Sequence, residues 1–397
     1  MKILYFHQHF STPNGSTGTR SYEFSKALIK AGHQVTIICG SYWIADSGLS
    51  GEFAYGMRRG LVDGIRVIEL ELPYSNTDNY FKRTWIFVKY SIAGIRIALT
   101  QSHDVLFATS TPLTAGIPGI IAKLLYRKRF VFEVRDLWPE LPKAMGVISN
   151  PIALKAMEIL ETISYKLADK CIAVAPGIAQ GIKQKFPHKI VAIIPNGSDE
   201  LQIVNNDPIQ KDKFVAAFTG AHGQANGLHA VLDVALILKN REELDIEFQF
   251  IGDGKLKPML MERAKNEKLD NCRFLTPMPK FEMFQYLHDN ADIGLMILDN
   301  IPAFYNGTSP NKFFDYLSLG LPVLNNYPGW VASLIKDNNC GRVVPPGDPL
   351  SFAEALIDLR NNDHDREEMG LNALRLSKRK FGRRLLAERF VKFIVVG

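Results

Sequence analysis

The sequence predicts an α/β protein built from two doubly wound, parallel-sheet (Rossmann-like) domains facing a cleft. Three observations predict this fold. At 397 residues the chain is longer than one ordinary domain. Short apolar runs alternate with helical stretches in both halves, as in a parallel sheet covered on both faces. The alternation breaks at the polar segment 196–212 and then starts again.

The first half opens with an apolar strand, a Gly/Ser/Thr loop at 11–18 and a helix that Gly32 ends. Further strands and helices then alternate. We expect strands at 2–6, 34–40, 65–70, 104–109, 129–134, 170–175 and 189–195, and helices at 20–31, after Pro112 and at 151–167.

The second half repeats this order. We expect strands at 214–220, 246–252, 272–275, 293–298 and 322–326, and helices at 227–239, 255–266, 280–289 and 310–319. The expected domains are 1–195 and 213–375, joined by a linker at 196–212. A C-terminal helix in 376–397 is expected to return to the first domain.

Composition favours an ordinary globular protein, with 46% hydrophobic and 22% charged residues. The four cysteines form no CxxC or Cys/His cluster, so we expect neither zinc nor a disulfide framework. The N-terminus is typical of a buried strand and not of a signal peptide, and charges interrupt the most apolar stretch, 85–99. We expect a cytoplasmic protein that does not span the membrane.

The net charge of +6 is uneven, which suits anionic lipid or phosphate partners.

The loop before the first helix is a candidate phosphate site. Gly15 and Gly18 allow close backbone approach, and Thr19 stands at a helix N-terminus with free N–H groups. A turn without a ligand explains the same residues, because the GxGxxG spacing is incomplete.

The segment 132–140 places charged residues and an indole at the end of a buried strand. We predict that Arg135 holds negative charge, that Asp136 orients or deprotonates a hydroxyl, and that Glu140 is the second candidate for that role. Trp138 is suited to stacking on a sugar. The alternative is a salt-bridged strand exit.

The segment 307–323 predicts a helix with a phosphate site at its start. Ser309 is expected to be the N-cap, followed by Pro310, Asn311 and Lys312. The free amides, the helix dipole and Lys312 suit a diphosphate, and Asp315, one turn later, suits ribose hydroxyls. The alternative is a capped helix whose charges face water.

Two glycine turns follow strands of the second half. Gly220, Gly223 and Gly227 lie between a strand and a helix, and Gly252 ends the next strand. Gly220, Gly223 and Gly252 allow the backbone to approach a bound diphosphate closely, although a plain turn explains each equally well.

The stretch 81–103 is amphipathic. Lys82, Lys89 and Arg96 recur every seven residues and share one helical face. This face is either merely solvated or binds an anionic membrane surface.

Together these motifs resemble the retaining GT-B glycosyltransferases of family 4, in particular the branch that makes bacterial O-antigen and capsule and includes N-acetylfucosaminyltransferases. The resemblance rests on GTSPNKFFDYLSLGLPV, RDLWPE, PNGSD, FTGAHGQANGL and FIGDG, and covers residues 1–380. It implies a GT-B fold whose second domain binds a nucleotide sugar, commonly a UDP-sugar, without a metal or other cofactor.

Three departures from the family pattern stand out. Of the Glu-x7-Glu pair, the second position is Asp315 and the first is Gly307. The Arg and Lys of the loop after the second domain's first strand fall on Ala221 and Asn226. The family's histidine at the first-domain strand exit is replaced by Arg135. We therefore expect Lys312 and Arg135 to supply charge for the phosphates.

The resulting expectation is transfer of an N-acetylated sugar from a UDP-sugar to a polyprenyl-diphosphate-linked glycan, at the inner face of the cell membrane, with no nucleic acid partner. A covalent carboxylate intermediate is not required. Two alternatives stay open: a UDP-sugar 2-epimerase of GT-B fold, and a non-catalytic nucleotide-sugar-binding subunit.

Overall fold

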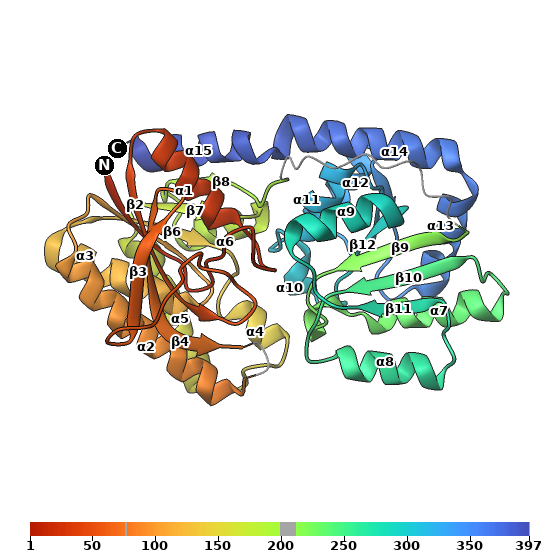
Figure 1. The fold of residues 1–397 in the computed structure, drawn as a ribbon, viewed down its shortest axis with the longest axis horizontal. Helices are drawn as coiled ribbons and strands as arrows, with labels where there is room; N and C mark the ends of the chain where they lie inside the picture. The colour runs from red at the N-terminus through yellow and green to blue at the C-terminus, as the bar shows by residue number, and fades with distance from the viewer. Residues whose placement is uncertain (76–77, 199–211, 397) are drawn as a thin grey trace. The chain divides into compact units, whose positions relative to one another are not determined.

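The computed structural model describes residues 1–75, 78–198 and 212–396, which divide into two compact units (Figure 1). The first contains Met1–Asn196, Asn306–Ser309 and Arg384–Gly397, and the second contains Gly197–Tyr305 and Pro310–Arg383. Each unit has its own sheet and its own core. The prediction of two doubly wound α/β domains is confirmed. Most of the expected linker, 196–212, lies outside the described residues.

The first unit holds an eight-stranded sheet in the order β3-β4-β2-β1-β5-β6-β7-β8. The described pairs are parallel except β3 with β4, an antiparallel edge that the sequence pattern did not predict. The strands are β1 (Lys2–Phe6), β2 (Gln34–Tyr42), β3 (Met57–Val62), β4 (Ile65–Tyr74), β5 (Val105–Thr109), β6 (Arg129–Val134), β7 (Lys170–Ala173) and β8 (Val191–Ile193). The chain reverses its winding between β1 and β5, where open sheets bind ligands.

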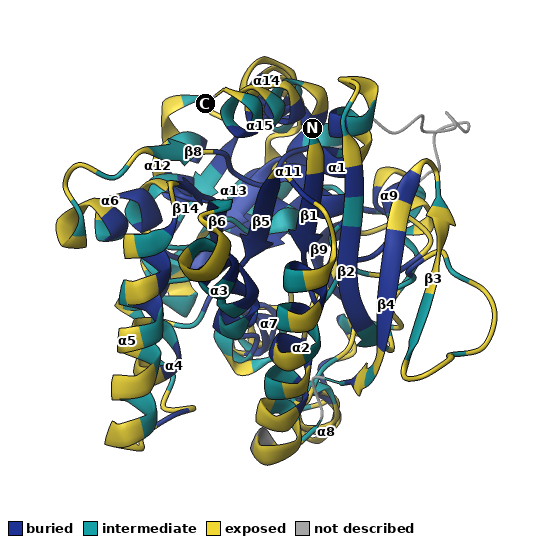
Figure 2. Cartoon of the chain, turned by 90° about the vertical axis from the view of Figure 1, so that its left-hand side faces the viewer, coloured by how far each residue is buried: buried dark blue, intermediate teal, exposed yellow. Residues whose placement is uncertain are grey.

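Helices cover both faces of this sheet. They are α1 (Arg20–Lys30), α2 (Tyr80–Thr100), α3 (Ile117–Tyr126), α4 (Glu140–Ala144), α5 (Pro151–Leu167) and α6 (Pro176–Lys185), with a short 3-10 turn at Leu113–Gly116. Side-chain caps begin two of them: Asn79 accepts a bond from the backbone N–H of Lys82, and Asn150 accepts bonds from the first turn of α5. Central strands such as β5 are buried along their length because both faces of the sheet are covered, as the dark blue colour of β5 in Figure 2 shows.

The second unit holds a six-stranded parallel sheet in the order β11-β10-β9-β12-β13-β14. Its strands are β9 (Phe214–Thr219), β10 (Ile246–Ile251), β11 (Cys272–Leu275), β12 (Ile293–Met296), β13 (Val323–Asn325) and β14 (Gly341–Val343). The winding reverses between β9 and β12. Its helices are α7 (His229–Asn240), α8 (Lys257–Asn266), α9 (Lys280–Asn290), α10 (Pro302–Tyr305), α11 (Asn311–Leu319), α12 (Trp330–Asp337), α13 (Pro349–Asn361) and α14 (Asp363–Leu376), with a 3-10 turn at Gln224–Asn226.

The end of the chain returns to the first unit later than expected. After α14, a π-helical turn at Ser377–Phe381 stays with the second unit, because the Phe381 ring packs 5.1 Å from that of Phe314 and its carbonyl accepts the Ser198 N–H. Helix α15 (Arg383–Val395) then belongs, from Arg384 on, to the first unit. The second unit therefore extends to Arg383 and not to residue 375.

Candidate active site

In the first unit, the predicted residues Arg135 and Asp136 follow β6 directly. The backbone N–H of Arg135 donates to Ser110 Oγ at 2.9 Å, and Thr111 Oγ1 lies 3.5 Å from Asp136 Oδ2. Both partners follow β5, the neighbouring strand. Burial raises the pKa of Asp136, and the nearby Arg135 charge opposes that shift. A half-buried carboxyl with a raised pKa at a strand end suits proton transfer.

Two histidines that the sequence analysis did not select share this edge. His7 and His9 follow β1, which pairs with β5. Burial lowers the pKa of both, that of His9 to about 3, and the charge of Arg135 adds to the effect. Both rings are therefore neutral at neutral pH. The signal that could have found them is the HQH run at the end of the first strand, which lies beside Arg135 only in the folded sheet.

Trp138 and Glu140 lie on the turn that follows. The backbone N–H of Trp138 donates to Glu161 Oε1 at 3.2 Å, and that buried carboxylate also accepts the Tyr165 hydroxyl and pairs with Lys185. Glu161, on helix α5, therefore holds this turn in place. The sequence analysis predicted the helix but did not select Glu161. Glu140 begins α4 and is exposed, in contrast to half-buried Asp136.

The loop before α1 is shaped by its own packing. A Cβ on Gly15 would stand 2.2 Å from Ser11 Oγ and 2.7 Å from the backbone nitrogen of Asp46, so this glycine is needed by the loop itself. Gly18 is half-buried, and Thr19 occupies the N-cap position without a side-chain capping bond.

Arg20, the first residue of α1, was not among the predicted site residues. Its side chain is 3% exposed and pairs with Glu133 at 2.7 Å. Thr109 Oγ1 donates to the other carboxylate oxygen at 2.8 Å, and Arg20 also donates to the carbonyls of Ile194 and Pro195. This buried network joins the start of α1 to the ends of β5 and β6.

In the second unit, Lys312 lies at the start of α11 beside the loop after β9. Its Nζ donates to Asn226 Oδ1 at 2.9 Å and lies 3.9 Å from the centre of the Phe218 ring. No ion pair with a carboxylate is found for it among residues 212–396. Burial lowers its pKa to about 7. An ammonium whose neighbours are an amide and an aromatic ring carries an unbalanced positive charge, and it is therefore suited to bind an anion.

Ser309 is not the N-cap of this helix, contrary to the prediction. Pro310 holds the N-cap position and makes no side-chain cap, and α11 begins at half-buried Asn311. The Ser309 hydroxyl instead accepts the Asn196 N–H at 3.0 Å, because residues 306–309 fold with the first unit. The α11 amides are thus left without a serine cap.

Asp315 does not face water. Its side chain is 8% exposed and lies 3.3 Å from Lys280 Nζ at the start of α9. The sequence analysis did not select Lys280. A fixed, paired carboxylate at this position is suited to accept hydroxyl donors.

Backbone conformation or close packing requires glycine at two of the predicted positions in the second unit, Gly220 and Gly252, but not at Gly223. Gly220 has φ +125° and lies against Lys312, with its would-be Cβ 3.3 Å from Cε. Gly252 has φ +144°, and a Cβ there would stand 2.0 Å from the Gly220 carbonyl, so the two turns pack directly on one another. Gly223 has open space where a Cβ would be, so packing does not require glycine there.

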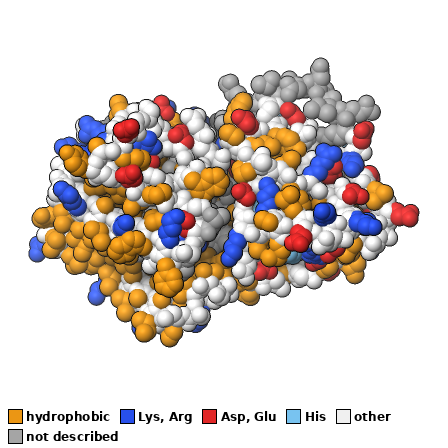
Figure 3. All heavy atoms as spheres, turned by 60° about the horizontal axis from the view of Figure 1, so that its bottom comes forward, with side chains coloured by type: hydrophobic (Ala, Val, Ile, Leu, Met, Phe, Trp, Pro, Cys, Tyr) orange, Lys and Arg blue, Asp and Glu red, His pale blue; other side chains and the backbone are white. Residues whose placement is uncertain are grey.

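The cations of α2 differ in their surroundings. Lys82 pairs with Asp78 at 2.6 Å, whereas Lys89 lies 5.6 Å from the Trp85 ring centre and Arg96 is exposed. Exposed apolar side chains accompany them, including Phe81, Trp85 and Ile92 on α2 and Leu124, Leu125 and Tyr126 at the end of α3. Figure 3 shows hydrophobic side chains gathered on one face of the first unit.

Two absences hold for the described residues. None of the helices there is both long and apolar enough to cross a membrane. No cluster of three or more His, Cys, Asp or Glu side chains in 1–75, 78–198 and 212–396 is arranged to hold a metal ion.

Comparison with known proteins places both halves of the chain. Residues 15–197 match the model of the "Glycosyl transferase 4-like domain", and residues 199–375 match that of "Glycosyl transferases group 1". An uncharacterized glycosyltransferase of Methanocaldococcus jannaschii is 20% identical over 212 residues, covering 53% of this chain and 55% of that protein. The chain thus spans about half the length of this curated relative.

Solved structures share the whole fold at low identity. Sucrose-phosphate synthase from Thermosynechococcus elongatus superposes with a TM-score of 0.77 at 14% identity, over 99% of this chain and 98% of that one. HepE of Anabaena, solved with UDP and glucose, gives 0.68 at 14% over 99% of each chain. WaaG, a glycosyltransferase of lipopolysaccharide biosynthesis, gives 0.69 at 14% over 100% of each. With both halves matched by glycosyltransferase domain models and the full length by this fold, the chain belongs to the GT-B glycosyltransferases.

Proposed function

We propose that this protein transfers an N-acetylated sugar from a UDP-sugar to a polyprenyl-diphosphate-linked glycan, retaining the anomeric configuration, in the synthesis of a cell-surface polysaccharide such as O-antigen. The observation that carries the donor part is the environment of Lys312. A half-buried ammonium without a carboxylate partner in the described second unit costs free energy unless an anion joins it.

Lys312 replaces a missing charge of the family pattern. The loop position at which relatives carry a lysine is Asn226, and Lys312 Nζ bonds to the side chain of that asparagine. A cation from α11 therefore reaches the place that a loop cation takes elsewhere. The diphosphate of the donor binds there, with the amides at the start of α11 and the backbone of Gly220 beside it.

The same groups assist the reaction. The bond between the anomeric carbon and the diphosphate breaks, and negative charge grows on the leaving diphosphate. Lys312 and the helix dipole of α11 stabilise that charge because they are in position before the reaction begins. Asp315, held by Lys280, accepts the ribose hydroxyls.

The acceptor hydroxyl is handled in the first unit. Asp136 orients it or takes its proton, and the raised pKa of this carboxyl is in keeping with that role. Arg135 lies beside it for a phosphate of the donor or the acceptor. Lys89, Arg96 and the exposed apolar side chains of α2 and α3 bind the anionic inner face of the membrane, where a lipid-linked acceptor lies.

Calorimetry of UDP binding tests the donor site. Lys312→Ala is expected to weaken binding by about 1.5–3 kcal/mol, the range for a hydrogen bond to a charged group. Lys336→Ala removes an exposed charge from the same unit and serves as the matched control. Unchanged affinity in Lys312→Ala would remove this lysine from the site.

A transfer assay tests the reaction. A panel of nucleotide sugars is incubated with the protein and a membrane lipid extract, and mass spectrometry identifies the added sugar. Transfer of an N-acetylated sugar from UDP to a lipid-linked glycan is expected. Turnover of the donor without an acceptor indicates the epimerase instead, and UDP binding without any turnover indicates a non-catalytic subunit.

A further inference from the structure

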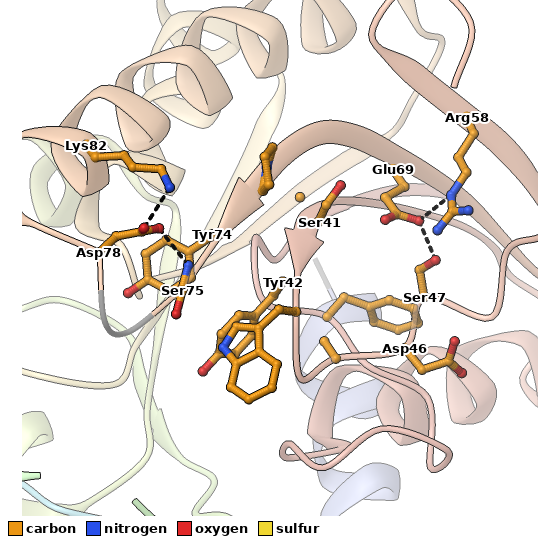
Figure 4. A pocket seen from close by; sticks show the side chains of 15 residues that line it. Ser41, Tyr42, Asp46, Ser47, Arg58, Glu69, Tyr74, Ser75, Asp78 and Lys82 are labelled. Atoms are coloured by element: carbon orange, nitrogen blue, oxygen red, sulfur yellow. Dashed lines mark hydrogen bonds and ion pairs between the residues drawn. The ribbon is translucent and has the colours of Figure 1, made fainter. Parts of the chain in front are cut away.

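A pocket of about 340 Å³ opens at the carboxyl ends of β2 and β4 in the first unit (Figure 4). Its wall is formed by the end of β2 and the residues after it, by β3 and β4, and by the first turn of α2. Small-molecule sites are roughly 300–1,000 Å³, so the pocket is large enough for one small ligand.

One wall of the pocket is aromatic. Trp43 follows β2, and 62% of its surface is exposed although it lines a concave site. The rings of Tyr42 and Tyr74 lie 5.3 Å apart at 69° and fix the wall beside it. An exposed indole next to buried aromatic packing provides a flat apolar surface, which suits the C–H face of a sugar ring.

The polar wall carries more negative than positive charge. Among the described lining residues, Glu69 pairs with Arg58 at 2.8 Å and Asp78 pairs with Lys82 at 2.6 Å. Asp46 has no such cation and is instead held by the Thr12 hydroxyl and the Gly48 N–H. Figure 4 shows the two ion pairs on opposite sides of Tyr42. Carboxylates held in this way accept hydroxyl donors and repel phosphates and acidic sugars.

The side chain of His9 links the wall of the pocket to the edge that carries Arg135. The His9 ring packs against two rings of the pocket, 5.1 Å from that of Tyr42 and 4.7 Å from that of Tyr74. On its other side, His9 is close enough to Arg135 for that charge to lower the pKa of its ring. A ligand in the pocket therefore lies one side chain away from the candidate catalytic edge.

Gln8 lies behind the Gly40 side of the pocket. Its side chain is 1% exposed, and its Cγ lies against Gly40, which lines the pocket. The backbone at this side of the pocket is therefore backed by a buried side chain.

We propose that this pocket binds an uncharged sugar ring of the glycan acceptor, with Trp43 against the ring face and Asp46 accepting its hydroxyls. The acceptor's diphosphate binds elsewhere, because the excess negative charge excludes it. This proposal rests on the proposed glycosyltransferase function and names the part of the acceptor that the first unit selects.

Saturation-transfer NMR on the full chain, with UDP present to fill the donor site, tests the pocket. The probes are methyl glucoside, methyl N-acetylglucosaminide and glucuronate. We expect the two neutral sugars to receive saturation and glucuronate to receive much less. Trp43→Ala should abolish the signal of the neutral sugars, Trp43→Phe should keep part of it, and Asp46→Asn should narrow the difference from glucuronate.

Trp85→Ala is the matched control, since it removes another exposed indole, 56% exposed and outside the pocket. Equal neutral-sugar signals in wild type and Trp43→Ala, or preferential binding of glucuronate, would overturn the pocket proposal. So would the absence of any neutral-sugar signal in the wild type. UDP calorimetry separates the two proposals. Normal UDP binding together with an unchanged neutral-sugar signal in Trp43→Ala would contradict the pocket proposal alone. Failure of the wild type to bind UDP would contradict the proposed donor site.

Discussion

The ammonium of Lys312 lies where water cannot solvate it fully, and this gives the donor site a pH dependence. Burial lowers its pKa to about 7, against the usual 10.5. The charged form that binds a diphosphate is therefore lost as pH rises above 7, well before ordinary lysines lose their protons. An arginine in its place keeps its charge throughout this range.

The expected outcome is that UDP affinity falls between pH 7 and 9, approaching about tenfold per pH unit, if only the charged lysine binds. Lys312→Arg should show a nearly flat profile, as measured by calorimetry at matched ionic strength. The unfolded chain binds more protons than the folded one between pH 7 and 10.5, so this lysine's contribution to the free energy of unfolding rises with pH over that window. A flat wild-type affinity profile would show that the Lys312 charge is not used.

Asp136 leads to a second prediction at the residue scale. Asp136→Asn removes the acid–base function and keeps the shape, so UDP binding should be unchanged while the transfer rate falls by about 10²–10⁴-fold. Exposed Glu140 supplies the comparison through Glu140→Gln, which should retain activity. Full turnover in Asp136→Asn with loss in Glu140→Gln would move the role to Glu140.

Much of this residue-scale pattern could be predicted. Arg135, Asp136 and Lys312 follow strand ends or begin a helix, and local sequence marks such positions. Lys280 and Glu161 could not be found in this way, because their relevance depends on partners far away in the chain. Lys280 lies 3.3 Å from Asp315 only because α9 and α11 pack together.

At the scale of elements, α2 combines two surfaces on one helix. Its first turn contributes Lys82 to the pocket through the bond to Asp78, and the helix then exposes Lys89 and Arg96 beside apolar side chains. The sevenfold spacing predicts that the three cations share a face but not that one of them is already paired. The membrane-binding charge is therefore assigned to Lys89 and Arg96.

Binding to vesicles that contain anionic lipid tests this surface. Lys89→Gln with Arg96→Gln should weaken binding by about 2 kcal/mol, since each cation near such a surface contributes about 1 kcal/mol. The paired change Lys336→Gln with Arg375→Gln removes the same charge from exposed positions of the second unit and should have little effect. Equal binding by both double variants would indicate a merely solvated face on α2.

At the scale of the molecule, the last helix completes the first unit's core. Phe390 on α15 is fully buried, 4.3 Å from the Phe24 ring and 5.1 Å from that of Phe107. Arg129 and Lys170 donate to carbonyls at the end of α15. Helix α15 thus packs into the core beside the sheet that contains β1.

Phe390→Ala should lower the free energy of unfolding by about 3–5 kcal/mol, the range for truncating a buried phenylalanine. Denaturant unfolding followed by circular dichroism measures it. Exposed Lys392 on the same helix provides the control, and Lys392→Ala should change stability by less than about 0.5 kcal/mol. A small loss for Phe390→Ala would mean that α15 adds little to this core.

The sequence by itself determined the two α/β domains, the order of their strands and helices, and the motifs at the strand ends. These follow from short-range periodicity and turn chemistry, which each segment carries alone. Only the tertiary structure decided that Ser309 bonds to Asn196, that Lys312 reaches Asn226, and that Phe390 of the returning helix stacks on Phe24. Such contacts join residues tens to hundreds of positions apart, and the packing of whole elements, which no local pattern encodes, selects them.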